Sequence, residues 1–479
     1  MPLCPYALMP LCPYALMPSD INKISLRPLL VSLALVGVVA LLKFSSYCTS
    51  VPAKAGVLAL FTLLLWATAL LPEYLTALLF FLLAMVFSLA GPEVIFAGFG
   101  SAAIWLIFGG LVVGIAISST GLGARIARYV AVWLHGSYFK IISGLVIAGV
   151  LFSFLMPSAM GRVVLLTPIA LSVADHFGFT KGSQGRTGVL LALILGTYIP
   201  AFGILPANVP NMVLVGMAET QYNLSILYGS YLFLHFPLLS LVKAVLIIAL
   251  ILFFFPDKPV VAPEQKKSEK LTFSRNEVIL SLVVVGMLGM WITDFLHHVS
   301  PAWVALGGAL ILLMPSVNIV GTKEFNQKVN WGAIIFVAGI LGVGGMINST
   351  GLGRIIASGI IDLLPLAEDQ SFINYMSISV ASAVTGMLTT LPAVPAVLTP
   401  LSESLSQVTG LPIQTLLMMQ VVGFSTIMLP YQAPPIVVGM QLSGEKLVDA
   451  AKICLVLACI TIFLLLPLNF FWWKLLDWL

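Results

Sequence analysis

Long apolar blocks alternate with short polar segments along this chain, and most of the blocks have a similar length. The first four blocks lie at 27–43, 52–71, 75–90 and 101–119. Each is close to the roughly 20 residues that a helix needs to cross the hydrocarbon core of a bilayer. The pattern therefore predicts four transmembrane helices in the early part of the chain.

Two later apolar runs, at 141–174 and 372–407, are interrupted in the middle. The first run contains Pro157 and the charged Arg162, and the second contains Pro392. Proline in a helix interior removes a hydrogen bond and kinks or breaks the helix. Each run therefore predicts two half-helices that meet at a tip, which is a re-entrant hairpin, rather than one long crossing.

Two further runs, at 189–217 and 413–441, contain prolines near the middle, and each predicts one crossing with an unwound centre. Irregular backbone occurs at membrane depth only where it is buried in protein or lines a wet cavity, and paired broken helices are typical of transporter sites. Unbroken spans are predicted at 226–255, 277–296, 301–316, 330–348 and 447–472.

The same order of elements occurs twice. Ser119–Gly123 and Ser349–Gly353 are identical and lie 230 residues apart, which indicates an internal repeat. We therefore predict an all-α polytopic membrane protein with two repeats, about 11 transmembrane helices and two re-entrant hairpins. The predicted domains are an N-terminal tail at 1–26, the first span with repeat 1 at 27–255, a cytoplasmic linker at 256–275 and repeat 2 at 276–479.

Composition excludes a water-soluble domain. The chain is 60% hydrophobic and 8% charged, whereas soluble domains contain about 25% charged residues. Its first sixteen residues repeat one octapeptide, which we interpret as an artefact rather than a targeting signal. We expect a multi-pass integral protein of a plasma or inner membrane.

Charge predicts the orientation. Sixteen of the 22 Lys and Arg residues fall in segments that are cytoplasmic if the N-terminus is inside, and four fall outside. Because cytoplasmic loops are enriched in these residues, the N-terminus is predicted inside and the C-terminus outside. An odd number of crossings separates the starts of the repeats, so the repeats are predicted to have inverted topology. Only Arg162 and Lys243 remain within apolar sequence.

Short motifs add a family resemblance. Thr-Gly-Leu-Gly precedes a basic residue at Thr120–Arg125 and again at Thr350–Arg354. In these motifs the chain resembles the divalent-anion/sodium symporter family, the dicarboxylate, citrate and sulfate carriers of the ion transporter superfamily, over nearly everything after residue 27. The family's Ser-Asn-Thr signature, ten residues before a proline, falls on Ser158 and Thr390, but its Asn and Thr are absent.

The resemblance implies an elevator-type transporter, usually a homodimer, whose hairpin tips and unwound loops bind sodium and the substrate carboxylates. The missing signature residues leave Na⁺ coupling, H⁺ coupling and exchange open. The candidate substrate-binding residues are Ser158, Ala159, Arg162, Thr389, Thr390, Asn208, Asn211 and Pro434, and the candidate ligands of a coupling ion are Ser158, Thr390, Gly203 and Asn211.

Arg162 is the charge inside the first interrupted run. An anion held in the membrane needs its charge neutralised, and a guanidinium suits bidentate recognition of carboxylate or sulfate. We hypothesise that Arg162 anchors the anion in place of the family's sodium. The alternative is a structural arginine that caps carbonyl groups at the tip or pairs with a scaffold carboxylate. Glu73 either carries a proton or simply sits at a helix end.

These features predict a secondary active transporter of small anions such as succinate, malate, 2-oxoglutarate, citrate or sulfate. We expect no catalytic residue, organic cofactor, metal site or nucleic-acid partner, because the five cysteines lack metal spacing and no acid–base motif is present. Two alternatives stay open, the membrane subunit of a binding-protein-dependent carrier and an anion channel.

Overall fold

The computed structural model describes residues 26–44, 50–68, 70–123, 125, 137–259 and 274–479, and every regular element within these ranges is helical. Nine of the described helical segments are long and apolar enough to cross a membrane. The prediction of an all-α polytopic membrane protein is thereby confirmed. The predicted tail, up to residue 25, and most of the linker predicted at 256–275 lie outside the described residues.

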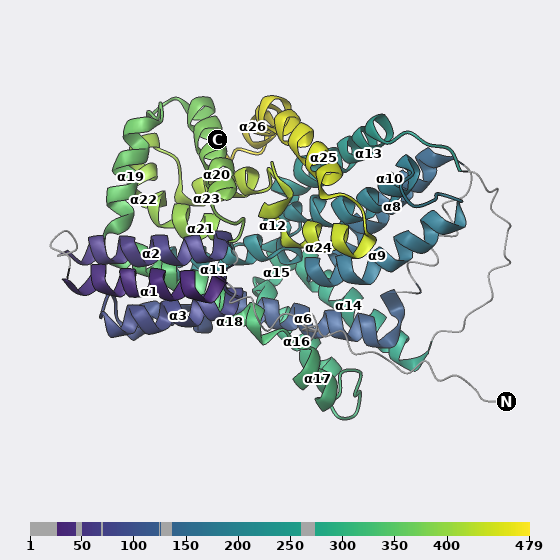
Figure 1. Ribbon diagram of the computed structural model, residues 1–479, viewed down its shortest axis with the longest axis horizontal. Coiled ribbons are helices and arrows are strands. Elements are labelled where there is room, and N and C mark those ends of the chain that lie inside the picture. Colours follow the sequence, from purple (N-terminus) through teal and green to yellow (C-terminus); the bar gives the residue numbers. More distant parts are fainter. Residues whose placement is uncertain (1–25, 45–49, 69, 124, 126–136, 260–273) are drawn as a thin grey trace.

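The early spans of both predicted repeats form one group of helices, the scaffold layer, which runs along the lower half of Figure 1. Its members are α1 (Leu26–Phe44), α2 (Val51–Thr68), α3 (Glu73–Val86), α6 (Ala102–Thr120), α14 (Arg275–Ile292), α16 (Pro301–Leu313) and α18 (Trp331–Ser349), with the short α4 (Pro92–Ile95), α5 (Ala97–Gly100), α15 (Asp294–His297) and α17 (Thr322–Lys328).

The remaining helices form a second group, the hairpin group, in the upper half of Figure 1. From the first half of the chain it contains α8 (Tyr138–Leu155), α9 (Ala159–His176), α10 (Gln184–Tyr198), α11 (Val209–Tyr222), α12 (Tyr228–His235) and α13 (Lys243–Phe254). From the second half it contains α19 (Leu352–Leu363), α20 (Ser371–Leu388), α21 (Ala393–Leu398), α22 (Ser402–Thr409), α23 (Ile413–Phe424), α24 (Pro434–Ser443), α25 (Leu447–Ile460) and α26 (Leu466–Leu475).

The helical breaks fall where the sequence predicts them. Residues 156–158 separate α8 from α9, and residues 389–392 separate α20 from α21. Both arms of each pair pack against one helix, α10 for the first pair and α23 for the second. Short 3₁₀ turns fill the breaks that follow α10 and α23, namely η1 (Pro200–Gly203), η2 (Leu205–Ala207) and η5 (Pro430–Gln432). The depth of these tips in a bilayer stays a prediction.

The last long helix of each half contains a π-helical segment. η3 (Phe236–Val242) joins α12 to α13, and η6 (Thr461–Leu465) joins α25 to α26. η3 packs against the first break, where the hydroxyl of Ser240 donates to the carbonyl of Pro200. The π-helical segment therefore holds the unwound backbone of the first half in place.

In the scaffold layer, helices from the first half of the chain pack against helices from the second half. α6 packs against α16, and α18 packs against α3. A Cβ added to Gly109 would lie 2.6 Å from the carbonyl carbon of Ala305, and a Cβ added to Gly339 would lie 2.5 Å from the Cβ of Ala77. Glycine therefore sets the backbone separation at both crossings, because no other residue lets the helices approach so closely.

Two tryptophans make matching hydrogen bonds. The indole N–H of Trp66, at the end of α2, donates to the carbonyl of Glu73 at 3.1 Å. The indole N–H of Trp291, at the end of α14, donates to the carbonyl of Pro301 at 3.1 Å. Each bond fixes the first residue of the following helix, α3 or α16. Such matching contacts support an internal repeat, and the inverted orientation of its copies stays a prediction.

The Thr-Gly-Leu-Gly motifs have a steric origin. Gly121 and Gly351 have φ of 78° and 77°, a left-handed conformation that glycine adopts without a penalty and that ends helices. Added Cβ atoms at the second glycines would meet the hairpin arms of the same half, 2.8 Å from Leu165 for Gly123 and 3.2 Å from the Pro400 carbonyl for Gly353. The first glycine of the motif thus ends a scaffold helix, and the second allows close packing against a hairpin arm.

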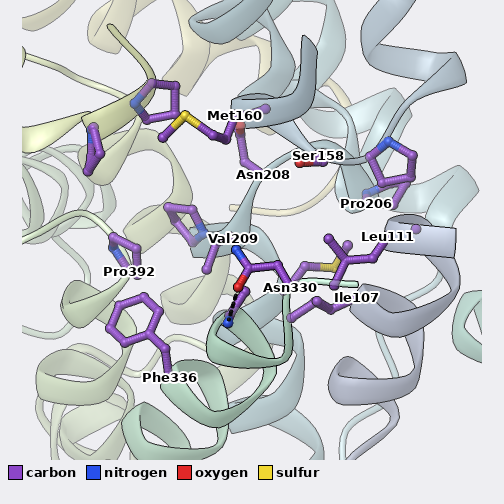
Figure 2. Close-up of a pocket in the computed structure, with 18 of the residues that line it drawn as sticks. Ile107, Leu111, Ser158, Met160, Pro206, Asn208, Val209, Asn330, Phe336 and Pro392 are labelled. Atoms are coloured by element: carbon purple, nitrogen blue, oxygen red, sulfur yellow. Dashed lines mark hydrogen bonds between the residues drawn. The ribbon is translucent and has the colours of Figure 1, made fainter. Parts of the chain in front are cut away.

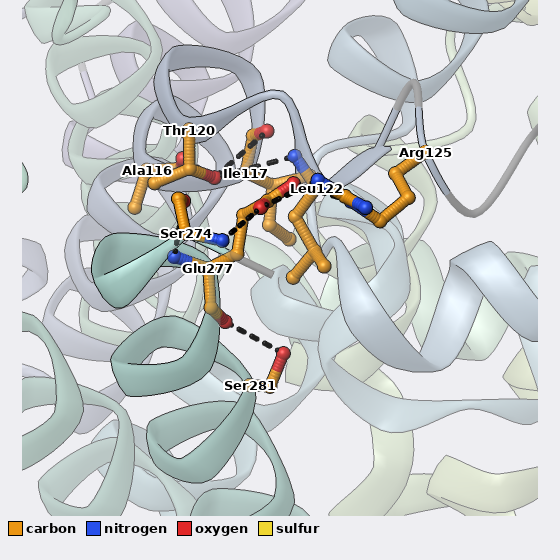
Figure 3. A network of polar contacts seen from close by, with 8 residues as sticks. All are labelled: Ala116, Ile117, Thr120, Leu122, Arg125, Ser274, Glu277 and Ser281. Carbon is orange, nitrogen blue, oxygen red and sulfur yellow. Dashed lines mark hydrogen bonds and ion pairs between the residues drawn. The ribbon is translucent and has the colours of Figure 1, made fainter. Parts of the chain in front are cut away.

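A buried ion pair joins the two halves. Nε of Arg125 lies 2.6 Å from Oε1 of Glu277, and Nη2 lies 2.8 Å from Oε2 (Figure 3). Glu277 also forms a capping box with Ser274 at the start of α14. This bidentate pair links the segment after α6 to the first turn of α14.

We expect Gly109→Ala and Gly339→Ala to destabilise the protein. The added methyl groups would overlap Ala305 and Ala77, and overpacking of this kind costs about 1–3 kcal/mol. Thermal unfolding in detergent provides the measurement. Gly286→Ala in α14 is the control, since nothing lies within 4 Å of its added Cβ, and it should leave the melting temperature unchanged or higher. Equal melting temperatures for all three variants would contradict the close crossings.

Candidate functional site

A cavity of about 210 Å³ lies where the hairpin group meets the scaffold layer (Figure 2). Both hairpin tips reach it, through Pro157 and Pro392, and both helix breaks reach it, through Asn208 and Pro434. The scaffold layer supplies the other wall with Glu73, Ile107, Gly110, Leu111, Asn330, Ala333 and Phe336. Four segments that are far apart in the sequence therefore converge on one cavity.

Four helix N-termini surround this cavity. α9, α11, α21 and α24 begin at the tips and breaks that line it. At α9 the hydroxyl of Ser158 accepts the N–H of Gly161 at 3.1 Å and caps the helix. A helix N-terminus carries a positive partial charge, which favours a bound anion. The start of α24 offers this charge without N–H donors, since its first two residues are Pro434 and Pro435, and at α21 the N–H of Ala393 already donates to the carbonyl of Thr390.

Four of the predicted substrate-binding residues line the cavity, namely Ser158, Ala159, Asn208 and Pro434. The side chain of Asn208 braces the first break, since its amide fits a donation to the Ala207 carbonyl at 3.1 Å and acceptance of the Phe202 N–H at 3.3 Å. The cavity is therefore lined mainly by prolines and apolar side chains, with a few polar atoms and the helix N-termini among them.

Arg162 lies behind the wall of the cavity and is fully buried. Its guanidinium donates to the carbonyl of Met156 at 2.5 Å in the first tip. It also donates to the carbonyl of Thr197 at 3.0 Å and the hydroxyl of Thr197 at 3.2 Å at the end of α10, and to the carbonyl of Ala207 at 3.1 Å in the break. The geometry thus matches the carbonyl-capping alternative and not direct contact with an anion in this conformation.

Lys243 occupies a similar position at the second break. It is fully buried at the start of α13, and its Nζ donates to the carbonyl of Ser425 at 2.8 Å and to the hydroxyl of Ser425 at 3.0 Å. Ser425 directly follows α23. No described carboxylate forms an ion pair with Lys243 or Arg162. Each cation instead meets carbonyl groups at the negative end of a half-helix.

The other predicted residues also lie outside the lining. Thr389 donates to a carbonyl of its own helix α20, Gly203 packs against η3, and Asn211 donates to two carbonyls of the first break. Oγ1 of Thr390 and Oδ1 of Asn211 are buried without a hydrogen-bond partner among the described residues. These two oxygen atoms keep the capacity to bind water or an ion.

Three polar lining residues were not predicted as substrate ligands. They are Glu73 at the start of α3, Tyr198 at the end of α10 and Asn330 before α18. Oδ1 of Asn330 accepts the N–H of Ala333 at 3.1 Å and caps α18 (Figure 2). Sequence reasoning left Glu73 open and missed the other two, because nothing in the sequence distinguishes them from ordinary residues at helix ends.

Comparison with known proteins places the chain among transporters. The family profile described as a citrate transporter matches residues 61–423. A protein called "Membrane protein" from Cupriavidus necator is 26% identical over 398 residues, 80% of this chain and 76% of that protein. The sodium-dependent dicarboxylate transporter SdcS of Staphylococcus saprophyticus is 25% identical over 318 residues, 60% of this chain and 61% of the relative.

Among solved structures, the fold is similar to that of the Alcanivorax borkumensis YdaH transporter, whose crystal structure is described as having an unusual topology. The TM-score is 0.51 at 12% sequence identity, and the match covers 81% of this chain and 88% of that one. At this identity the likeness concerns the fold alone.

We expect Arg162→Gln to lower the stability of the protein without any ligand. The substitution removes donors from the carbonyls of Met156, Thr197 and Ala207 in a buried setting, which costs at least about 2 kcal/mol. Thermal unfolding of the empty protein tests this. A variant that melts like the wild type but loses anion binding would instead show that Arg162 is the anion anchor.

Proposed function

Because this chain belongs to the citrate transporter family, we propose that it is a secondary active carrier that moves a small di- or tricarboxylate across the membrane by alternating access. The chain is a membrane transporter and not an enzyme. The observation that carries the proposal is the cavity at which two hairpin tips, two helix breaks and four helix N-termini meet. A carrier needs one such central site that can be exposed to either side in turn.

The cavity supports a small substrate. Its volume of about 210 Å³ is below the roughly 300–1,000 Å³ of pockets for drug-sized ligands. Positive helix ends favour an anion, and Ser158 and Asn330 add polar atoms. A dicarboxylate such as succinate or malate fits this description first, and citrate is the larger candidate.

The two helix groups support an elevator mechanism. In our proposal the hairpin group carries the substrate, and the scaffold layer stays fixed, because its halves are locked by the close crossings at Gly109 and Gly339. We further propose inverted repeats, re-entrant tips and a homodimer, with the N-terminus in the cytoplasm and the C-terminus outside.

Arg162 and Lys243 bind carbonyl groups that a sodium ion would otherwise coordinate. Arg162 binds the carbonyls of the first tip and break, and Lys243 binds a carbonyl of the second break. These are the kind of ligands that a sodium ion would use, so we propose exchange or proton coupling rather than sodium coupling at these positions.

Saturable counterflow distinguishes the proposed carrier from a channel. Transport without an added soluble protein distinguishes it from a binding-protein-dependent carrier.

Counterflow in proteoliposomes tests the proposed function. Vesicles loaded with unlabelled succinate or citrate should accelerate uptake of the same labelled anion, and removal of Na⁺ should leave the rate unchanged. Absence of counterflow for both anions would contradict the proposal, and an absolute requirement for Na⁺ would contradict the proposed exchange or proton coupling.

We expect Ala159→Leu to reduce this counterflow by about tenfold or more, because a larger side chain in the cavity overpacks the bound anion by about 1–3 kcal/mol. Ala159 is the first residue of α9, where leucine is compatible with a helix, so the fold should persist. Ala34→Leu on the exposed face of α1 is the control and should transport normally. Wild-type rates for Ala159→Leu would show that the substrate binds elsewhere.

A further inference from the structure

Glu73 is the only charged side chain among the described residues that line the cavity. It is the first residue of α3, and its backbone carbonyl is fixed by the indole of Trp66. Its carboxylate makes no ion pair with any described residue. A negative charge therefore stands, without a paired cation, in a cavity whose helix ends favour an anion.

The surroundings of Glu73 contain few other charges. Of the helices that pack against α3, α18 contributes no titratable side chain, and α2 and α4 contribute Lys54 and Glu93, which lie toward the opposite end of α3. Tyr74 follows in the chain, and Tyr198 shares the cavity wall. Arg162 lies behind the cavity wall near Tyr198, but its guanidinium donates to backbone carbonyls, and no described residue forms an ion pair with Glu73.

The repeat gives the counterpart of Glu73 on the opposite side. Trp66 bonds the carbonyl of Glu73 as Trp291 bonds that of Pro301, and both residues begin a helix that crosses its partner at an alanine four positions on. Pro301 is therefore the equivalent position, and it has no charge. The two ends of the proposed transport pathway therefore differ in charge, with a carboxylate at one end and a proline at the other.

We propose that Glu73 weakens anion binding on one side of the membrane only, and so favours release there. The inference rests on the proposed function, in which the hairpin group moves and α3 stays fixed. The carboxylate then faces the anion when the cavity opens at the N-terminal end of α3, and it is far from the anion in the opposite state. The predicted topology makes this the cytoplasmic side.

The sign of the pH dependence follows from this arrangement. When Glu73 is ionised it repels the anion, and when it is protonated the repulsion is lost. Anion affinity on the Glu73 side therefore falls as pH rises, beyond any change caused by ionisation of the anion itself. Affinity on the Pro301 side lacks this component.

The test compares the two sides in proteoliposomes of known orientation, with succinate and citrate as the probes. Glu73→Gln should lower the KM on the Glu73 side on the order of tenfold, remove the pH component on that side, and leave the KM on the other side unchanged. Glu73→Ala should behave in the same way. Glu93→Gln on α4 is the control and should match the wild type.

The outcomes separate the two proposals. If the wild type shows counterflow and Glu73→Gln changes neither KM, or changes both KM values equally, the one-sided role of Glu73 is overturned. If the wild type shows no counterflow of either anion, the proposed function itself fails, and this inference fails with it. Melting temperatures of both variants show that the protein is folded in each assay.

Discussion

Unwound backbone inside an apolar chain leaves polar groups that must find partners, and this constraint determines much of the structure. A buried carbonyl without a hydrogen bond costs about 1–3 kcal/mol. Arg162 meets three such carbonyls, at the first tip, the end of α10 and the first break, and Lys243 meets one at the second break. Because these cations satisfy the backbone, the breaks can stay open toward the cavity, where a few polar side chains and the helix ends remain available to a ligand. The chemistry of the site thus depends on two residues that do not line it.

The sequence predicted the positions of the breaks and the spans well, because prolines and apolar length act locally. Of the residues predicted to bind substrate, Ser158, Ala159, Asn208 and Pro434 line the cavity, and their role in binding stays a prediction. The family profile confirms the resemblance that the Thr-Gly-Leu-Gly motifs indicated. The sequence could not decide whether Arg162 anchors an anion or caps carbonyl groups, because the position of a charged residue near a tip does not determine the direction of its side chain. Glu73 and Asn330 could not be assigned from sequence, since their place in the wall depends on how the scaffold layer packs against the hairpin group.

Glycine has two separate uses in this fold. Gly121 and Gly351 provide a backbone conformation, whereas Gly109 and Gly339 provide space. At the second pair of glycines, the scaffold helices touch through backbone atoms and alanine methyl groups, and neither can change rotamer. Such close helix crossings suit a part of the protein that keeps one shape. The hairpin group, whose breaks are held by hydrogen bonds, contains the elements suited to movement.

The π-helical segment before α13 explains how Lys243 reaches the interior. Lys243 directly follows η3 (Phe236–Val242). A π turn accommodates one residue more than an α turn, and one residue corresponds to a rotation of about 100° around the helix axis. In a continuous α-helix with the same number of residues, Lys243 would be rotated by about 100° around the helix axis, away from its contact with Ser425. The extra residue in η3 thus sets the angular position at which Lys243 faces the second break.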